Sequence, residues 1–122
     1  RVIERLKGDT FFSEITDWYN TPTYIPDLTS GIMSLIKNNL VGIFHITGSD
    51  FLNRYDSAVL IAEVFKLENK LLKQINSSEL KLPAKRNNVN LSNKKLFQET
   101  GIRMLGFKDG LTKMLEDKKI WE

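Results

Sequence analysis

The chain has no cysteine, which excludes disulfide bonds and thiolate metal sites within its 122 residues. It has one histidine, His45, so a metal site built from several histidines is also excluded. No apolar run is long enough to span a bilayer, and no signal-peptide pattern is present. We therefore expect a cytoplasmic protein with no metal site and no membrane partner.

Recognisable catalytic signatures are also missing from the chain. The seven glycines form neither the G-x-G-x-x-G loop that binds dinucleotides nor a phosphate-binding P-loop. No G-x-S-x-G motif and no Ser-His-Asp order can be assembled. His45 lies within an apolar run, where we expect a hydrogen-bonded, half-buried imidazole in preference to a catalytic base. The residues alone predict no catalytic residue here and indicate a binding surface instead.

What the chain does contain is ordinary for one globular domain, with 41% apolar and 27% charged residues. The net charge is +3. A nucleic-acid-binding surface would interleave basic residues with aromatics, which here lie mostly elsewhere. We therefore expect no nucleic-acid partner, although a basic nucleic-acid-binding module stays open as an alternative. The basic residues are densest at Lys81, Lys85, Arg86, Lys94 and Lys95.

Residues 42–65 form the segment around which we expect the chain to fold. The apolar run 43–46 ends at a Thr-Gly pair and predicts a buried strand followed by a turn. Asn53 is placed as a helix N-cap with Asp56 three residues later, and apolar residues then recur at helical spacing. The polar turn 48–54 would lie at the carboxyl end of the strand, where ligands bind in open α/β sheets.

The remaining pattern predicts an α/β fold with few short strands and about four helices. Short strands are predicted at 10–15 and 72–75. A brief helix is predicted with Asn93 as its N-cap and Gly101 at its C-terminal end, and a last helix begins near Gly106. One amphipathic helix, which we expect to be purely structural, carries on a single face Leu28, Ile32, Leu35 and Ile36.

The first candidate binding element is an aromatic loop. Three large aromatic residues lie within seven positions of a stretch that also contains Pro22 and has no regular apolar spacing: Trp18, Tyr19 and Tyr24. One interpretation is a hydrophobic plug beneath the loop. The other is a stacking surface for a flat ring, because aromatic faces accept bases and sugars with little geometric demand.

The second candidate element is the polar, basic loop 81–90, which contains a proline and ends in an asparagine-rich stretch. One interpretation is a solvated connector between helices. The other is an anion-binding loop in which Lys85 or Arg86 meets a phosphate, since both side chains suit that ligand.

Several short motifs follow one another along the chain. They are, in order, V-I-E-R-L-K-G, D-W-Y-N-T-P-T-Y, G-I-F-H-I-T-G, R-Y-D-x-A-x-x-I-A-E-V-F, S-S-E-L-K-L-P-A, L-S-N-K-K-L and G-x-x-x-M-L. With these motifs, the chain from residue 2 to about residue 115 closely resembles the C-terminal part of the dTDP-4-dehydrorhamnose reductases, in the extended short-chain dehydrogenase/reductase superfamily. The chain also begins with Arg1 inside a helical pattern, so we expect a piece of a longer protein.

The resemblance implies that residues 1–122 form a single C-terminal substrate-binding lobe, with 42–47 as the last strand of a Rossmann sheet. In the family, an N-terminal Rossmann domain carries the glycine-rich loop and a catalytic Tyr-x-x-x-Lys pair, and neither motif occurs here. The implied partners are that domain and a dTDP-sugar, with assembly of several copies left open. NAD(P)H would be the cofactor of the full-length protein, and this part alone would bind none and catalyse nothing.

The resemblance also implies substrate-binding roles for particular residues. Residues 17–23 match the family's D-x-Y-G-x-P-T loop, with Asn20 where glycine is usual. The basic loop matches an Arg-Pro-x-Asn turn, but the proline is missing, so Lys85 could replace Arg86 as the ligand of the diphosphate. The residues assigned to the substrate are Trp18, Tyr19, Thr21, Arg54, Tyr55, Lys85 and Arg86.

The same resemblance covers a non-catalytic relative, the regulatory β subunit of methionine adenosyltransferase, which keeps the fold and serves as a binding partner. The first alternative to a reductase is therefore a regulatory subunit. A catalytic Tyr-x-x-x-Lys pair elsewhere in the protein would favour the enzyme, and its loss would favour the regulatory role.

Overall fold

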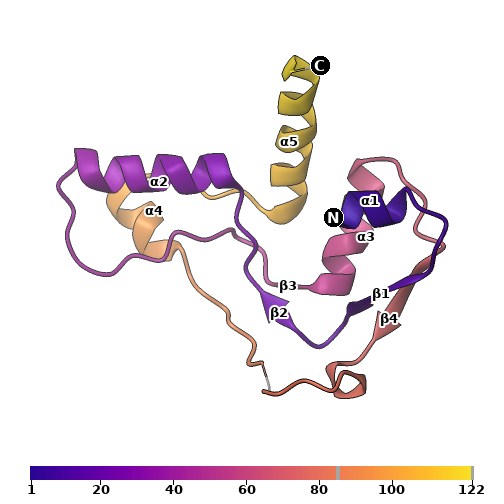
Figure 1. Cartoon of the computed structure of the whole chain (residues 1–122). Coiled ribbons are helices and arrows are strands. Elements are labelled where there is room, and N and C mark those ends of the chain that lie inside the picture. The colour runs from indigo at the N-terminus through magenta and orange to yellow at the C-terminus, as the bar shows by residue number, and fades with distance from the viewer. Residues whose placement is uncertain (85, 122) are drawn as a thin grey trace.

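The computed structural model describes the backbone of residues 1–84 and 86–121 and the side chains of residues 1–84 and 86–117. It is a mixed α/β structure of helices and a few short strands, which confirms the predicted fold class. The described part has one α-helix more than the four expected. The elements are α1 (Val2–Leu6), β1 (Phe12–Ile15), β2 (Tyr19–Asn20), α2 (Ile25–Lys37), β3 (Leu52–Asn53), α3 (Arg54–Val64), β4 (Leu72–Ile75), the 3₁₀-helix η1 (Ser77–Glu79), α4 (Lys94–Thr100) and α5 (Phe107–Trp121) (Figure 1).

The strands form two small pairs. β1 and β4 are parallel, with Phe12 opposite Leu72 and Ile15 opposite Ile75. β2 and β3 are antiparallel and join the aromatic loop to the start of α3, with Tyr19 opposite Asn53. The strands predicted at 10–15 and 72–75 are thus present. α1, α3 and the β1–β4 pair lie at one end of the molecule, α2 and α4 lie at the other, and α5 rises between them (Figure 1).

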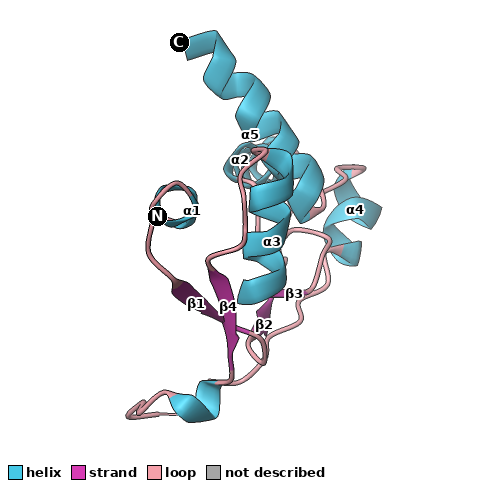
Figure 2. Cartoon of the chain, turned by 90° about the vertical axis from the view of Figure 1, so that its right-hand side faces the viewer, coloured by secondary structure: helices cyan, strands magenta, loops and turns pink. Residues whose placement is uncertain are grey.

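The first part of the core lies where α3 packs on β1 and α1 (Figure 2). Ala58 and Ala62 are 1% and 2% exposed, and their small side chains let α3 approach its neighbours closely. Leu6, Ile15 and Leu72 close this cluster from α1, β1 and β4. Asn53 caps α3 as predicted, because its side-chain oxygen accepts the Asp56 N–H at 2.7 Å.

The second part of the core lies beneath α2, where Leu96 of α4 is fully buried. Gly31 makes this packing possible, since a Cβ there would lie 2.7 Å from the Ile46 side chain. The predicted apolar face of α2 is only partly covered, because Ile32 and Ile36 are 43% and 64% exposed. The purely structural role expected for this helix stays a prediction, and its exposed apolar residues are not packed within the described part of the chain.

Residues 42–46 are not a strand in this structure, which corrects the prediction for that segment. A strand needs a neighbour that satisfies its main-chain groups, and neither described sheet offers one to this segment. Instead the Ile43 carbonyl accepts a hydrogen bond from Lys95 Nζ at 2.9 Å. Val41 and Ile43 are 88% and 80% exposed. Pairing of this segment with a Rossmann sheet stays a prediction.

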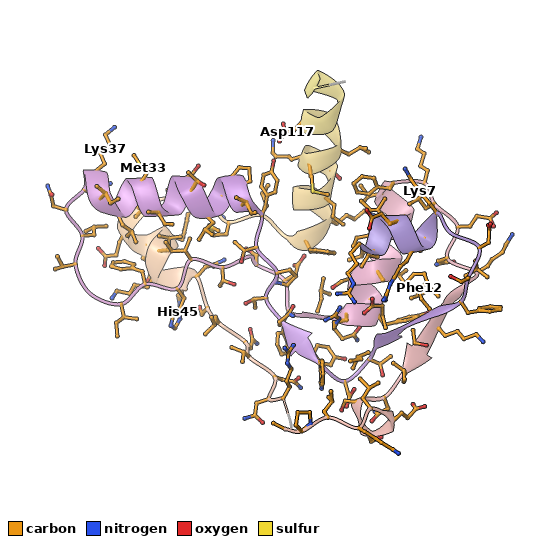
Figure 3. All side chains as sticks on the ribbon, viewed as in Figure 1. Lys7, Phe12, Met33, Lys37, His45 and Asp117 are labelled. Atoms are coloured by element: carbon orange, nitrogen blue, oxygen red, sulfur yellow. The ribbon has the colours of Figure 1, made fainter. Side chains whose placement is uncertain are left out.

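The expectation of a half-buried His45 is also wrong, because its side chain is exposed and projects from the surface (Figure 3). The reason is the same: within the described residues no neighbouring strand covers this segment, so the His45 side chain faces outward while that of Ile46 packs against Gly31. Of two predictions about the ends of α4, one is confirmed and one is wrong. Gly101 ends α4 with φ 72°, as expected. Asn93 precedes α4 without capping it, because its amide donates to the Thr47 carbonyl at 2.9 Å.

Candidate functional site

The base of the aromatic loop is fixed where residues 21–23 cross residues 47–48. The buried Thr47 hydroxyl donates to the side-chain and main-chain oxygens of Thr21 at 2.6 and 3.0 Å. The Gly48 N–H donates to the Thr23 hydroxyl at 3.1 Å. These hydrogen bonds join two segments that are far apart in sequence. They hold the aromatic loop in one position relative to the start of α3.

The other end of the loop is fixed by Asp17. Its carboxylate accepts the Ser77 N–H at 2.8 Å and the Ser77 hydroxyl at 2.5 Å, so the loop is tied to η1. The hydroxyl bond is the main reason that the pKa of Asp17 is lowered from 3.8, against an opposing effect of desolvation. Asp17 is therefore ionised at neutral pH and keeps Trp18 beside η1.

Trp18 and Arg86 meet across the two candidate loops. The Arg86 guanidinium carbon lies 5.0 Å from the centre of the Trp18 ring, within the range of a cation–π contact. The aromatic loop and the basic loop, predicted separately, are therefore in contact. One face of Trp18 is already covered by an arginine, which differs from the simple stacking surface that the sequence suggested.

The basic loop is also held by main-chain contacts with β2. The Tyr19 N–H donates to Asn88 Oδ1 at 2.9 Å, and the Val89 N–H donates to the Tyr19 carbonyl at 3.3 Å. Figure 1 shows the segment after residue 85 rising beside β2 toward α4. The Tyr19 ring lies against Phe51, with ring centres 5.2 Å apart. The backbone of Tyr19 thus holds the basic loop in place, and its ring packs on Phe51.

Two cavities share the Trp18–Arg86 contact as a common wall. The first, of about 290 Å³, is completed by η1 and the start of the basic loop: Ser77, Ser78, Leu80, Leu82 and Ala84. The second, of about 330 Å³, is completed by β2, the start of α3 and the rest of the basic loop: Tyr19, Asn20, Arg54, Asn87 and Val89. Both cavities thus have Trp18 and Arg86 in their walls, to which the first adds two serines and three apolar side chains, and the second adds Arg54 and two asparagines.

Arg54 reaches the second cavity from the first residue of α3. Its Nε donates to Glu14 at 3.0 Å, and Glu14 also lies 3.7 Å from Arg5. The Glu14 side chain is only 5% exposed, whereas those of Arg54 and Arg5 are 45% and 41% exposed. The second cavity is therefore bordered by two arginines, Arg54 and Arg86, of which one is paired with a buried carboxylate.

The structure brings together four of the seven residues that the resemblance assigned to the substrate: Trp18, Tyr19, Arg54 and Arg86. Thr21 instead faces Thr47 in the crossing described above. Tyr55 is half-buried and lines neither cavity. Lys85 lies outside the described residues. The second prediction for the basic loop, that Lys85 replaces Arg86, stays untested.

Sequence reasoning missed three residues that organise the site: Glu14, Ser77 and Asn88. Asn88 lies at the asparagine-rich end of the basic loop, and the asparagine of the matching Arg-Pro-x-Asn turn was the available signal for it. Ser77 lies in a segment for which the sequence predicts a capped turn, and Asn76 and Glu79 do form a capping box around η1. Its contact with Asp17 left no signal in the sequence. Glu14 gave a weaker signal, as a lone charge in an apolar strand.

A separate cavity of about 410 Å³ lies between the start of α2 and α5, with mostly apolar walls. At its edge the Tyr24 hydroxyl donates to Asp117 at 2.6 Å, and this bond raises the pKa of Tyr24 to about 12. Figure 3 shows Asp117 on α5.

No group of three or more His, Asp or Glu side chains in the described part is arranged to hold a metal ion. No helix described is long and apolar enough to cross a membrane.

Comparison with known proteins gives a family match over almost the whole chain. The family model described as "RmlD substrate binding domain" matches residues 1–120. No curated protein matches.

Several solved structures are similar to the chain. A dTDP-4-dehydrorhamnose reductase from Clostridium acetobutylicum ATCC 824 has a TM-score of 0.84 and 25% identity, over 97% of this chain and 42% of that one. The enzyme from Bacillus anthracis str. Ames, in complex with NADP, has a TM-score of 0.82 and 20% identity, over 95% and 41%. The enzyme from Yersinia enterocolitica has a TM-score of 0.76 and 21% identity, over 92% and 40%. The chain thus spans about two-fifths of the length of these structures.

Proposed function

Because the chain belongs to the RmlD substrate binding domain family, we propose that it is the sugar-nucleotide-binding part of an NAD(P)H-dependent dTDP-4-dehydrorhamnose reductase. The whole enzyme would reduce the 4-keto group of a dTDP-linked 4-dehydrorhamnose to the alcohol of dTDP-L-rhamnose. The cofactor supplies the hydride, and the protein supplies binding and orientation. The three tyrosines of this chain are not followed by lysine four positions later, so the proton donor would come from another part of the protein.

The observation that carries the proposal is the contact between Trp18 and Arg86, with a cavity on each side. We infer that the cavity beside η1, which has Trp18, Leu80 and Leu82 in its walls, receives the thymine ring, and that the cavity bordered by both Arg54 and Arg86 receives the diphosphate. Arginine suits this role because its planar N–H donors match the oxygens of a phosphate. Asn20 and Asn87 supply further donors beside the arginines.

The proposal includes a Rossmann domain of the same protein as partner. The support is a group of exposed apolar side chains at one end of the chain, on α2 and on the segment that follows it. Exposed apolar surface of this kind often marks a region that another protein covers. This surface, which we name the α2 face, comprises Ile32, Met33, Ile36, Val41 and Ile43.

The experiment that tests the proposal is an NADPH-oxidation assay with the dTDP-linked keto sugar. We expect turnover by the full-length natural protein and none by the isolated 122 residues. Turnover by the isolated chain would refute this division of labour, and a full-length protein that binds dTDP without turnover would favour the regulatory alternative.

The binding site is tested in the same assay with Arg86→Gln. We expect KM for the keto sugar to rise by about 10-fold or more, because a charge-assisted hydrogen bond is worth roughly 1.5–3 kcal/mol. The matched control is Arg103→Gln. Arg103 also lies over an aromatic ring, at 4.4 Å from the centre of Phe97, but it borders neither cavity. A control that raises KM equally would refute the assignment of the site.

A further inference from the structure

Glu14 is a charged side chain in an unusual place. It lies in β1 and its side chain is only 5% exposed, although ionised carboxylates are seldom buried without a partner. Its partners come from two different helices, Arg5 of α1 and Arg54 of α3, which lie on the same side of the strand (Figure 2). Burying the Glu14 carboxylate costs desolvation free energy. An apolar residue at this position would therefore stabilise the fold at least as well, if packing were its only role.

The two arginines are used differently. Arg5 lies over the Phe12 ring at 5.8 Å and is 3.7 Å from Glu14, so it covers two residues of the same strand face. Arg54 makes the shorter contact, 3.0 Å from its Nε to Glu14. Of the two, only Arg54 also borders the cavity shared with Arg86.

The bond from Nε restricts where the rest of the Arg54 guanidinium lies. A guanidinium is planar and rigid, and its terminal nitrogens carry four more N–H donors. Once Nε is bound to a buried carboxylate, the remaining donors have a fixed direction instead of the many rotamers of a free arginine. An exposed arginine without such a partner would lose that freedom only when a ligand binds, and affinity would fall by that cost.

We propose that Glu14 is a positioning residue that holds Arg54 toward the diphosphate of the bound sugar nucleotide. This inference rests on the proposed function of the site. Glu14 itself does not touch the ligand and acts only through Arg54.

Simple electrostatics and positioning predict opposite signs for the loss of this carboxylate. Glu14→Gln removes a negative charge near an anion site, so charge alone would make a diphosphate bind more tightly. Positioning predicts weaker binding, because the amide holds Arg54 less firmly. A merely structural role predicts lower stability of the protein with no change in affinity.

The test titrates the full-length natural protein with dTDP, thymidine and inorganic pyrophosphate by calorimetry. For Glu14→Gln we expect dTDP and pyrophosphate affinity to fall about 3- to 10-fold, the range expected for one long side chain that must be ordered on binding. Thymidine affinity is expected to stay unchanged. Arg5→Gln is the matched control, since it removes the other ion pair of Glu14, and we expect less than a roughly 2-fold change.

Two further variants make the coupling explicit. In an Arg54→Gln background, Glu14→Gln should cause no additional loss, because the residue through which it acts is gone. Glu14→Asp keeps the charge but shortens the side chain by one methylene, so dTDP affinity should fall less than with Glu14→Gln. This variant carries the same test if Glu14→Gln does not fold.

The outcomes separate the inference from the proposed function. Unchanged or tighter dTDP binding in Glu14→Gln, in a protein that binds dTDP, overturns the positioning role and leaves the proposed function standing. Loss of pyrophosphate binding in Glu14→Gln, in a protein with no preference for dTDP over pyrophosphate, keeps the positioning role and refutes the proposed substrate. A wild-type protein that binds neither probe refutes both.

Discussion

At the scale of single residues, the crossing of residues 21–23 with 47–48 depends on Gly48. A Cβ at this position would lie 2.0 Å from the Pro22 carbonyl oxygen, and that oxygen belongs to the backbone. A flexible side chain could move away from a new methyl group, but two crossing backbones have to separate. The Thr47–Thr21 hydrogen bonds would be stretched by the same movement.

Gly48→Ala is therefore expected to destabilise the protein by about 3 kcal/mol, the upper range for overpacking of a tight site. Gly8→Ala is the control, because a Cβ there would meet its nearest atom at 3.5 Å, an ordinary contact. Urea denaturation of both variants checks the prediction. Equal midpoints for the two variants would show that the crossing can relax without cost.

Asp17 gives a pH-dependent prediction at the same scale. Its pKa is lowered in the folded state, mainly by the Ser77 hydroxyl, so the folded form binds its proton less readily than the unfolded form. The stabilisation is present above pH 3.8 and is lost as the pH falls through the lower, folded pKa. Asp17→Asn should consequently have a lower Tm than the wild type at neutral pH.

The difference in Tm between wild type and Asp17→Asn should shrink as the pH is lowered from about 6 to about 2.5. Differential scanning calorimetry over this range measures it. Asp9→Asn, at an exposed position, is the control and should follow the wild type. A Tm difference that stays constant down to the lowest pH would argue against the Asp17–Ser77 bond.

Individual residues were predictable where a local rule applies. Asn53 as a helix cap and Gly101 as a helix end follow from backbone geometry that few residues satisfy, and both are confirmed. Glu14 was not predictable, because its role depends on two helices that meet the strand only in three dimensions. His45 was misjudged for a related reason: an apolar run in the sequence does not say whether anything covers it.

At the scale of elements, α2 and α5 are joined at one point by Tyr24 and Asp117. The bond favours the protonated phenol, and the pKa of Tyr24 rises from 10.0 to about 12. A raised pKa in the folded state means that the stabilisation is complete below pH 10.0 and is lost between pH 10.0 and about 12.

We expect Tyr24 to ionise near pH 12, and Asp117→Asn to bring its pKa back toward 10.0. Phenolate absorbance followed during alkaline titration measures this, with Tyr24→Phe identifying the signal among the three tyrosines. A wild type in which all three tyrosines titrate together would contradict the contact between α2 and α5.

Most elements could be predicted from the sequence, because each has a period or a boundary residue of its own. The strands predicted at 10–15 and 72–75 are present as β1 and β4, and the start of α3 follows from its cap. The strand expected at 42–46 failed because strand formation is a property of a pair. β2 and β3 were not predicted either. Each has only two residues, which carry no recognisable pattern, and they form strands only because they pair with each other.

At the scale of the whole molecule, the α2 face is the least explained by this chain alone. Val41 and Ile43 are 88% and 80% exposed, so their replacement by threonine should change the stability of the isolated chain by less than about 0.5 kcal/mol. If a Rossmann domain covers this face, the double variant should destabilise the full-length protein by roughly 2 kcal/mol or more.

Urea denaturation of both forms makes the comparison. The control is Phe11→Thr, since Phe11 is 63% exposed and follows α1, at the opposite end from α2 (Figure 1). Phe11→Thr should change the free energy of unfolding by the same amount in the isolated chain and in the full-length protein. Equal small effects of the Val41/Ile43 double variant in both forms would mean that no domain of the protein packs on this face.

The meeting of the two candidate loops could be anticipated only through the family resemblance. Some seventy residues separate Trp18 from Arg86, and no periodicity connects them. Their contact arises because Asp17 is tied to η1 and the basic loop is tied to β2. The resemblance implied that both loops serve one substrate, but it did not indicate that an arginine would lie on the tryptophan.

The most direct test of the account is hydrogen–deuterium exchange of the full-length natural protein with and without dTDP, resolved along the chain. If the cavities beside the Trp18–Arg86 contact hold the nucleotide, dTDP should slow exchange in residues 17–20 and 86–91 and leave residues 32–43, which include the α2 face, unchanged. Saturating dTDP that leaves exchange in 17–20 and 86–91 unaltered would contradict it.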